Sequence, residues 1–369
     1  MKILFSISDH DACSEYRCKI PARALERHFD DVETEVCISP AFGQLRSADI
    51  VVFQRYHSSH KENLELARTL GKVTIFETDD LDIHLPWQNP LQPLYRFMGW
   101  DKEIRYLAAN ADWVTCTTPI LAEELSKFNR NVRVFPNMIE LDAPQWNFKR
   151  DNHREDVVIG WVGGVTHKED LQIVEGFISQ LTREFKHVKF SLCGYTKKVR
   201  ALKLVKGPNG EPLVYRIPAD QVTNTWDTII KMFSDIPTDQ LIIQESRPFD
   251  QYPSFFTEFD IIIAPVVDTR FNRSKSELKI IEAGAYGLPV VASRVGMYEQ
   301  VIQHGETGFL CRNGKDFVKY LRRLIVDKRL RKELGTNLRK FVEKNYDINR
   351  KIGGRHQFYK EILERRTWQ

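Results

Sequence analysis

The sequence predicts an α/β protein built from two doubly wound parallel-sheet domains that face each other across a cleft. Apolar strand-like runs alternate with helix-like segments over the first 140 residues, and the same alternation restarts after residue 156. Continuous apolar runs of this kind are typical of parallel strands covered by helices on both faces. The length of 369 residues also exceeds the size at which a single core usually keeps growing.

The first Rossmann-like domain is expected within residues 1–150. Its predicted strands are 2–8, 34–39, 48–55, 72–78, 112–118 and 132–137. Its predicted helices are 17–29, 61–71, 101–111 and 119–128. Residues 142–156 are polar and irregular, which indicates a linker.

The second Rossmann-like domain is expected within residues 151–340. Its predicted strands are 157–164, 188–194, 239–246, 259–266 and 288–293, with helices at 168–185 and around 317–325. The basic stretch 196–226 receives no role. Residues 341–369 are expected to be helices that cross back to the first domain. The carboxyl ends of the strands in the two domains should then face one shared cleft.

The charge distribution is uneven although the net charge is only +4. From Lys319 to the end there are 16 Lys and Arg against 6 Asp and Glu, which leaves a net charge of −6 for the rest of the chain. The basic region is either a solvated helical face or a contact for phosphate-rich partners or an anionic membrane surface.

The cysteines and the amino terminus point to a soluble cytoplasmic protein. The six cysteines are scattered, with no C-x-x-C pair and no Cys/His cluster at zinc spacing, so we expect reduced thiols and no metal. No apolar run is long enough to cross a membrane, and no signal-peptide cleavage site follows the first strand.

A first candidate site lies where the strand 157–164 ends. Gly163 and Gly164 are followed by Thr166, His167 and Lys168 just before a helix. Glycines let the backbone approach an anion, and the start of a helix with nearby cations favours phosphate. The same glycines are equally consistent with a structural turn, because neither a dinucleotide fingerprint nor a P-loop is present.

The stretch NRSKSELKIIEAGAYGLPVVASRVG, residues 272–296, is a more specific signal. Lys275, Lys279 and Glu282 lie around the start of a predicted helix, after a strand. Lysines at a helix start suit a diphosphate, and a carboxylate can accept hydrogen bonds from the vicinal diol of a ribose. We expect Gly284 and Gly287 to keep the helix slim where a ligand or the next strand packs.

At this point the chain resembles the GT-B glycosyltransferases, specifically the large retaining family that includes sucrose synthases and bacterial mannosyl- and glucosyltransferases. The segments KIIEAGAYGLPVVAS and HGETGFL are similar to the nucleotide-sugar domain of that family. The segments ADWVTCTTPILAEEL and VRVFPNMIE look like elements of its first domain. The resemblance covers nearly the whole chain and is diffuse in the first 70 residues.

The resemblance implies roles for individual residues on the donor side. The family carries two glutamates separated by seven residues; Glu282 matches the second, which implies contact with the ribose, whereas Ser274 stands at the first. Sugar contacts would then come from the backbone of Ser274–Leu278 or from Asp268. Lys279, the glycine turn, His167 and Lys168 would bind the diphosphate, and the base would lie near Arg247. The full set of predicted donor-binding residues is Gly163, Gly164, Thr166, His167, Lys168, Arg247, Asp268, Asn272, Ser274, Lys275, Ser276, Glu277, Leu278, Lys279 and Glu282.

On the other side of the cleft the family often has a histidine after the fourth strand. Here the equivalent strand end carries Asp79 and Asp80, which would orient an acceptor hydroxyl or bind the donor sugar, or would simply cap a helix. We therefore predict Asp79, Asp80, Lys279 and Glu282 as catalytic residues. Arg17 and His57 are further acceptor-side candidates. Asp80-Leu81-Asp82 also matches the D-x-D signature of the GT-A fold, but the second Rossmann-like unit has no place in a GT-A chain.

The sequence thus predicts a retaining, metal-independent glycosyltransferase. It would move a hexose or similar sugar from a nucleotide-diphosphate sugar, with UDP favoured, to an acceptor hydroxyl of a glycan, lipid or small molecule. No cofactor is expected besides the donor. Hydroxymethylated DNA bases are an alternative acceptor, suggested by the basic tail and by Lys197–Lys206. An inactive nucleotide-sugar-binding protein is a third reading. The sequence leaves the sugar, the base and the acceptor open.

Overall fold

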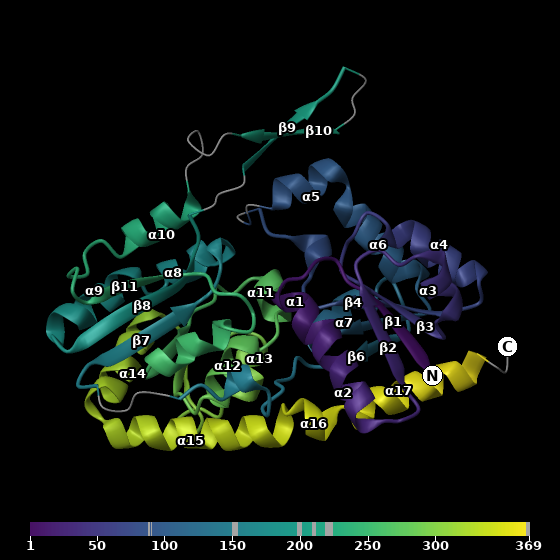
Figure 1. Ribbon diagram of the computed structural model, residues 1–369. Coiled ribbons are helices and arrows are strands. Elements are labelled where there is room, and N and C mark those ends of the chain that lie inside the picture. Colours follow the sequence, from purple (N-terminus) through teal and green to yellow (C-terminus); the bar gives the residue numbers. More distant parts are fainter. Residues whose placement is uncertain are drawn as a thin grey trace.

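The computed structural model consists of two α/β halves side by side, each built around a six-stranded sheet (Figure 1). It describes residues 1–87, 89, 91–149, 154–197, 201–208, 212–217 and 224–366. Every strand pair within the two six-stranded sheets is parallel. The doubly wound α/β architecture predicted from the sequence is confirmed.

The first sheet has the strand order β2-β1-β3-β4-β5-β6. Its strands are β1 (Lys2–Ser6), β2 (Glu33–Cys37), β3 (Ile50–Gln54), β4 (Val73–Thr78), β5 (Trp113–Cys116) and β6 (Val132–Val134). The order reverses direction between β1 and β3, and the loops after these strands therefore form the ligand crevice of this domain.

Short helices cover the two faces of the first sheet. They are α1 (Ala12–Ser14), the π-helix η1 (Glu15–Lys19), α2 (Ile20–His28), α3 (Phe42–Ser47), α4 (His60–Thr69), η2 (Asp82–His84), α5 (Gln92–Met98), α6 (Trp100–Asn110) and α7 (Pro119–Leu125). The sequence analysis placed a helix from residue 17, whereas a π-helical turn precedes α2.

The second sheet has the strand order β11-β8-β7-β12-β13-β14, so its direction reverses between β7 and β12. Its strands are β7 (Val157–Val162), β8 (Val188–Tyr195), β11 (Leu241–Glu245), β12 (Ile261–Ala264), β13 (Val290–Ser293) and β14 (Phe309–Cys311).

The second half contains ten helical segments among its described residues before α15. They are η3 (Pro144–Trp146), η4 (Val165–His167), α8 (Lys168–Gln172), α9 (Glu175–Glu184), α10 (Thr225–Met232), η6 (Tyr252–Glu258), α11 (Arg270–Ser274), α12 (Leu278–Ala285), α13 (Met297–Val301) and α14 (Gly314–Val326). The single helix predicted over 168–185 is divided into α8 and α9 at Ile173 and Val174. Side chains branched at Cβ crowd a helix, and these two residues form a turn in which the φ of Val174 is −117°.

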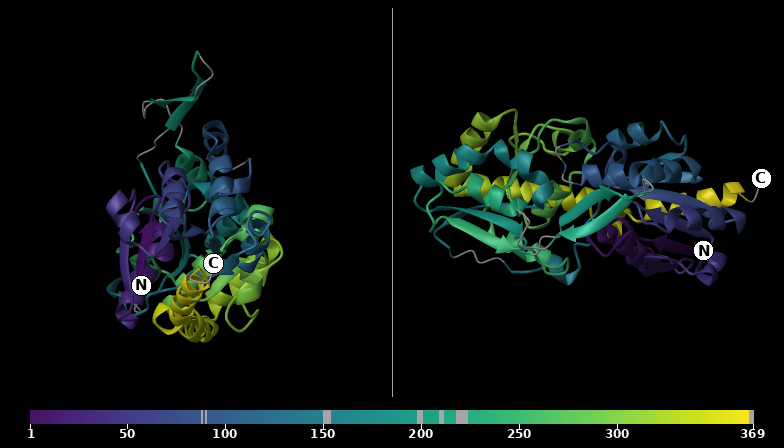
Figure 2. Two further views of the ribbon diagram at one scale, coloured as in Figure 1. Left: turned by 90° about the vertical axis from the view of Figure 1, so that its right-hand side faces the viewer. Right: turned by 90° about the horizontal axis from the view of Figure 1, so that it is seen from above.

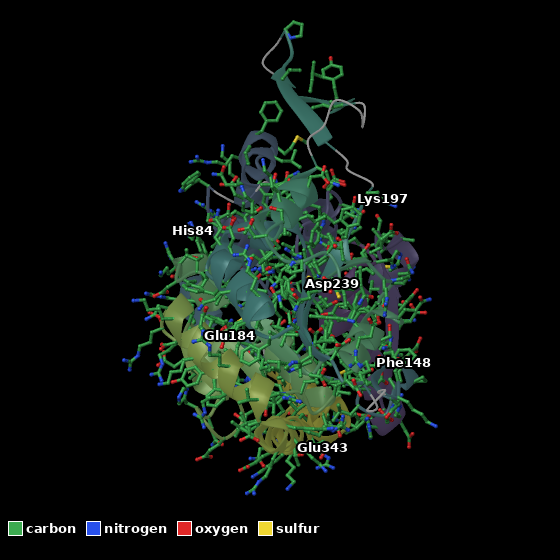
Figure 3. The ribbon with its side chains drawn as sticks, turned by 90° about the vertical axis from the view of Figure 1, so that its left-hand side faces the viewer. His84, Phe148, Glu184, Lys197, Asp239 and Glu343 are labelled. Atoms are coloured by element: carbon green, nitrogen blue, oxygen red, sulfur yellow. The ribbon has the colours of Figure 1, made fainter. Side chains whose placement is uncertain are left out.

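An antiparallel hairpin extends from the second half well beyond the body of the molecule (Figures 1 and 2). It consists of β9 (Ala201–Lys206) and β10 (Pro212–Ile217). Lys197, labelled in Figure 3, follows β8 and leads toward it. The basic stretch 196–226 thus contains this hairpin, while residues 198–200, 209–211 and 218–223 lie outside the described residues.

The last helices run along one side of both halves (Figures 1 and 2). They are α15 (Lys328–Asn345), α16 (Ile348–Lys351) and α17 (Gly353–Arg366). Helix α15 packs against α12 of the second half, whereas α16 packs on α2 and α17 on β4 of the first half. No helix among the described residues is both long and apolar enough to span a bilayer.

Glycines allow α12 and α15 to approach closely. A Cβ at Gly335 would lie 1.9 Å from the carbonyl oxygen of Gly287, and a Cβ at Gly284 would lie 2.5 Å from a methyl group of Val342. The small residues after Glu282, predicted to make room for a ligand or a strand, therefore make room for α15.

Replacing Gly335 by alanine should destabilise the fold by about 1 to 3 kcal/mol, because backbone atoms must move to admit the new methyl group. The free energy of unfolding by denaturant measures the effect. Gly353→Ala is the matched control, since no atom lies within 4 Å of its Cβ position, and it should leave stability unchanged or slightly raised. Equal stabilities for the two variants would contradict this packing.

Candidate active site

The two sheets present their carboxyl ends to one interdomain cleft with a volume of about 480 Å³. Both domains supply its walls. The lining residues are His10, Asp11, Ala12, Cys13, Tyr16, Asp79, Asp80, Asn137, His167, Arg247, Pro248, Phe249, Tyr252, Lys275, Ser276, Leu278, Lys279, Glu282 and Tyr298. The predicted residues Asp79, Asp80, His167, Arg247, Lys275, Ser276, Leu278, Lys279 and Glu282 therefore come together in space.

Lys279, on α12, extends its ammonium group to the carboxyl end of β7, beside the glycine turn. Its Nζ donates a hydrogen bond to the carbonyl oxygen of Val162 at 3.0 Å and lies over the ring of Trp161. A Cβ at Gly163 would come within 3.3 Å of the same Nζ. The pKa of Lys279 is lowered to about 8, chiefly by burial; Lys275 contributes to this shift and Glu282 opposes it. The ammonium is thus poorly solvated and donates to no carboxylate of the described residues.

Glu282, one turn further along α12, is 2% exposed and accepts hydrogen bonds from two tyrosines. Tyr16, from the first domain, donates to Oε1 at 2.8 Å, and Tyr252, from the second, donates to Oε2 at 2.9 Å. Burial raises the pKa of Glu282 to about 7, although both hydrogen bonds and Lys279 act to lower it. The carboxyl group consequently titrates near neutral pH.

His167 is held by Asp170, three residues later. Its Nδ1 donates to Asp170 Oδ2 at 2.7 Å, while Asp170 Oδ1 accepts from the Val267 amide at 2.7 Å and from Asn272 Nδ2 at 3.1 Å. Burial, together with the positive charges of Lys279 and Lys275, lowers the pKa of His167 to about 3. We expected this histidine to add positive charge, whereas its lowered pKa favours a neutral imidazole at neutral pH.

The opposite wall of the cleft is acidic. Arg55 binds Asp82 through Nε and Nη2 at 3.0–3.2 Å and lies 3.6 Å from Asp79 and 4.0 Å from Asp80. Asp79 Oδ1 is buried and accepts no hydrogen bond from a described residue. Burial raises the pKa of Asp80 to about 6, and Lys275 across the cleft opposes this shift. Asp80 therefore takes up a proton more readily than an ordinary carboxylate.

Two predicted acceptor-side residues lie elsewhere. Arg17 is fully buried; its Nε and Nη2 donate to Glu77, and its Nη1 donates to the carbonyl of Phe135 and to Asn137. The prediction that Arg17 faces the cleft is wrong, because a carboxylate 60 residues away neutralises it inside the domain. His57 is half-buried, hydrogen-bonds Ser59 and is not among the residues that line the cleft.

Several predicted donor-side residues lie around the cleft rather than in its wall. Asp268 is exposed and paired with Arg273, so it does not line the cleft. The hydroxyl of Ser274 is buried and donates to the carbonyl of Phe271. Glu277 is 1% exposed, and its carboxylate interacts with the hydroxyl of Tyr346 instead of lining the cleft. The remaining members of that set are Gly163, Gly164, Thr166, Lys168 and Asn272, of which Thr166 and Asn272 line a small adjoining cavity.

The predicted base-binding loop does reach the cleft. The guanidinium of Arg247 lies over the ring of Phe255 at 4.0 Å and donates to Glu258 Oε1 at 3.1 Å. Phe249, two residues later, meets the ring of Tyr16 edge-on at 5.3 Å. An aromatic side chain and a planar cation at this rim offer surfaces on which a nucleobase can stack.

Direct hydrogen bonds join the two domains beside the lysine-bearing loop. Thr118 donates its hydroxyl proton to the carbonyl of Ser274 at 2.9 Å, and Asn137 Nδ2 donates to Ser276 Oγ at 3.0 Å. The domains are therefore closed on each other at this loop.

Sequence reasoning missed Tyr16, Tyr252, Asp170 and Arg55. Asp170 had a local signal, because it follows His167 by three residues at a helix start, where side chains meet. The others had none, because their partners are remote in sequence. Among the described residues, no group of three His, Cys, Asp or Glu side chains is arranged to hold a metal ion.

Comparison with known proteins identifies one part of the chain. Residues 252–341 match the family described as glycosyl transferases group 1. The chain is 31% identical over 88 residues to N-acetyl-alpha-D-glucosaminyl L-malate synthase from Bacillus anthracis, which covers 23% of each protein. It is 33% identical over 125 residues to a sulfoquinovosyl transferase from Arabidopsis thaliana, which covers 32% of this chain and 22% of that protein. These matches thus span less than a quarter of either relative.

Solved structures resemble the whole chain. Sucrose-phosphate synthase from Thermosynechococcus elongatus superimposes with a TM-score of 0.67 at 13% identity, over 99% of this chain and 100% of that one. HepE from Anabaena, in complex with UDP and glucose, gives a TM-score of 0.65 at 14% identity, over 99% of both chains. At this identity the likeness establishes the fold alone.

Removing the carboxylate of Asp170 should destabilise the protein by about 2 to 4 kcal/mol, because three partly buried donors lose this acceptor. Denaturant unfolding of Asp170→Ala measures this. The neighbouring Glu169→Ala variant changes the same helix without removing a described hydrogen bond, and its effect should stay within about 0.5 kcal/mol. An Asp170→Ala protein as stable as the control would show that Asp170 does not organise this wall.

Proposed function

We propose that this protein is a retaining hexosyltransferase, because residues 252–341 match the group 1 glycosyl transferases and solved structures such as sucrose-phosphate synthase share the fold of the whole chain. It would move a hexose or similar sugar from a nucleotide-diphosphate sugar to an acceptor hydroxyl of a glycan, lipid or small molecule. Uridine is the favoured base, and the proposal includes neither a metal nor a cofactor besides the donor.

One observation carries the proposal. Lys275 and Lys279 meet the carboxylate of Glu282 in a single cleft, beside the glycine turn that ends β7. Two cations and nearby backbone amides suit a diphosphate, and a buried carboxylate suits the hydroxyl pair of a ribose. The spacing between Lys279 and Glu282, three residues on one helix, places the two functions side by side.

Charge stabilisation at the leaving group supplies the main rate enhancement in this proposal. Negative charge grows on the diphosphate as the bond to the sugar breaks, and Lys275 and Lys279 are already in place to balance it. The desolvated ammonium of Lys279 interacts more strongly with this charge than a solvated one would. His167 gains a proton more readily when a diphosphate lies beside it, because the anion favours the imidazolium.

The acidic wall would bind the acceptor and receive its proton. Asp80, whose pKa is raised to about 6, is suited to receive the proton of an acceptor hydroxyl, directly or through the departing diphosphate. Asp79 offers a buried oxygen that accepts no hydrogen bond from a described residue, which suits a sugar hydroxyl. In a retaining reaction the acceptor attacks on the face from which the diphosphate leaves.

The choice of a UDP-sugar rests on two supports. HepE, a structural neighbour, was solved with UDP and with UDP-glucose. Phe249 and Arg247 also form a stacking surface at the cleft rim. The sugar itself stays undefined, because Ser274 replaces the usual carboxylate and turns its hydroxyl inward.

Two other functions weighed from the sequence are less consistent with the cleft. A DNA acceptor would bring phosphates against Asp11, Asp79 and Asp80, which repel them. A binding protein without activity would not need Lys275 and Lys279 on one wall and a proton acceptor on the other. Measured transfer or donor hydrolysis above background separates this last reading from the proposal.

Purified protein should turn over at least one member of a panel of UDP-, GDP-, ADP- and TDP-sugars. Lys279→Ala and Glu282→Ala should each lower kcat/KM for that donor by roughly 100-fold or more, because charge stabilisation and ribose contact are lost. Release of nucleoside diphosphate gives the rate, and NMR of the product gives the anomeric configuration.

The control for this test is Lys332→Ala, which removes an exposed lysine from α15 and should leave kcat/KM unchanged. If Lys279→Ala and Glu282→Ala match the control, the donor site is assigned to the wrong residues. Inversion at the anomeric carbon would refute the retaining mechanism.

The rate should depend on pH within a narrow range. Donor capture needs Glu282 ionised, so kcat/KM should fall below its pKa of about 7, and it needs Lys279 protonated, so kcat/KM should fall above its pKa of about 8. Lys279→Arg should remove the alkaline decline, since arginine stays protonated. An unchanged decline in Lys279→Arg would mean that another group titrates there.

A further inference from the structure

The first domain contributes a side chain to the predicted ribose-binding carboxylate. Tyr16 OH donates to Glu282 Oε1 at 2.8 Å, although the two residues are 266 positions apart. Tyr252, from the same domain as Glu282, donates to the other oxygen at 2.9 Å. Each carboxylate oxygen therefore has one hydrogen bond, and the two bonds come from opposite sides of the cleft.

The position of Tyr16 is set by its neighbours within the first domain and by Phe249. It lies in the π-helix η1, a rare form that is frequent at functional sites. The next residue, Arg17, is fully buried inside the first domain and forms an ion pair with Glu77. Tyr16 instead reaches across the domain boundary to Glu282. The ring of Tyr16 is 3% exposed and packs edge-on against Phe249. This packing holds the hydroxyl of Tyr16 against Glu282.

The geometry leaves capacity for a ribose. An ionised carboxylate has about four acceptor positions, and the two tyrosines use two of them. One position remains on each oxygen, which matches the two neighbouring hydroxyls of a ribose. The tyrosines and a ribose are therefore compatible partners rather than competitors.

We propose that Tyr16 is a positioning residue for the donor: it orients Glu282 toward the ribose hydroxyls, and it does so only when the two domains are closed. This inference rests on the proposed function. Ribose recognition would then be completed by the acceptor-side domain, so that a donor is held correctly only in a closed cleft. Closure in turn excludes water from the sugar.

A second consequence concerns protonation. The titratable groups that face Glu282 are the hydroxyls of Tyr16, Tyr252 and Tyr298 and the ammonium of Lys279. The hydrogen bond from Tyr16 stabilises the ionised carboxylate and so lowers its pKa, against the effect of burial. Without that bond Glu282 should hold its proton to higher pH, and a protonated carboxyl group is a poorer acceptor for a ribose.

The test compares Tyr16→Phe with the parent in binding UDP and 2′-deoxyuridine diphosphate, and in steady-state kinetics with the donor. We expect the parent to prefer UDP, and Tyr16→Phe to lose roughly tenfold of that preference, the size typical of a hydrogen bond to a charged group. At pH 7 the donor KM should rise by a similar factor while kcat changes little, and the acidic limb of kcat/KM should move up by about one pH unit.

The ratio of the two affinities is independent of the fraction of folded protein, so a merely destabilised variant would keep the parent's ratio. Tyr320→Phe is the control, because Tyr320 lies on α14, does not line the cleft and makes no described hydrogen bond, so this variant should keep the parent's nucleotide preference. If Tyr16→Phe keeps both the parent's nucleotide preference and its acidic limb, the proposal is overturned. If the parent binds neither nucleotide nor any nucleotide sugar of the panel, the proposed function fails first, and the two failures are thereby distinguished.

Discussion

The closed arrangement of the two domains depends on a buried cation. Arg17 lies entirely inside the first domain, where its guanidinium donates to Glu77 on β4, to the carbonyl of Phe135 and to Asn137. A buried guanidinium must have such partners, because an uncompensated charge would cost several kcal/mol. The residues on either side of this network then reach the other domain: Tyr16 binds Glu282, and Asn137 binds Ser276. The hydrogen bonds of the Arg17 guanidinium thus help to position the two side chains, Tyr16 and Asn137, that contact the other domain.

The same network includes the C-terminal helices. Arg355 of α17 donates to the carbonyl of Arg17 at 3.3 Å and lies 3.9 Å from Glu77. Helix α15 meanwhile packs against α12, the helix that carries Lys279 and Glu282. The continuous run from α15 to α17 therefore connects the donor helix of the second domain to the core of the first. A change in the angle between the domains must therefore bend this run of helices or break these contacts.

The fold was predictable where the signal is local. Continuous apolar runs such as 50–54, 73–78 and 157–162 are buried parallel strands, as their composition indicated. The strand orders were not predictable, because pairing of β1 with β3 rather than with another strand depends on contacts distant in sequence. The β9–β10 hairpin was also missed, because ALKLVK and PLVYRI are short and alternate only in part, which gives a weak strand signal.

The site shows the same division. Lys275, Lys279 and Glu282 form one short motif, so their spacing alone suggested a common role, and the structure places them in one cleft. Arg17 was wrongly assigned to that cleft because an arginine is usually solvated, and nothing local reveals that Glu77 neutralises it. Tyr16 could not be predicted either, because its partner Glu282 lies in the other domain.

Lysines on one wall of the cleft and aspartates on the other create an electric field across it. Asp80 and Lys275 interact across it, yet no ion pair within 4 Å joins them in the described chain, so neither charge cancels the other. A donor diphosphate is attracted to the lysine wall and repelled from the aspartate wall, which leaves its sugar between them. In the proposed reaction, negative charge grows toward the lysines while a proton leaves the acceptor toward Asp80. Both shifts follow the field that the two walls already impose, so the protein need not reorganise as the charge moves.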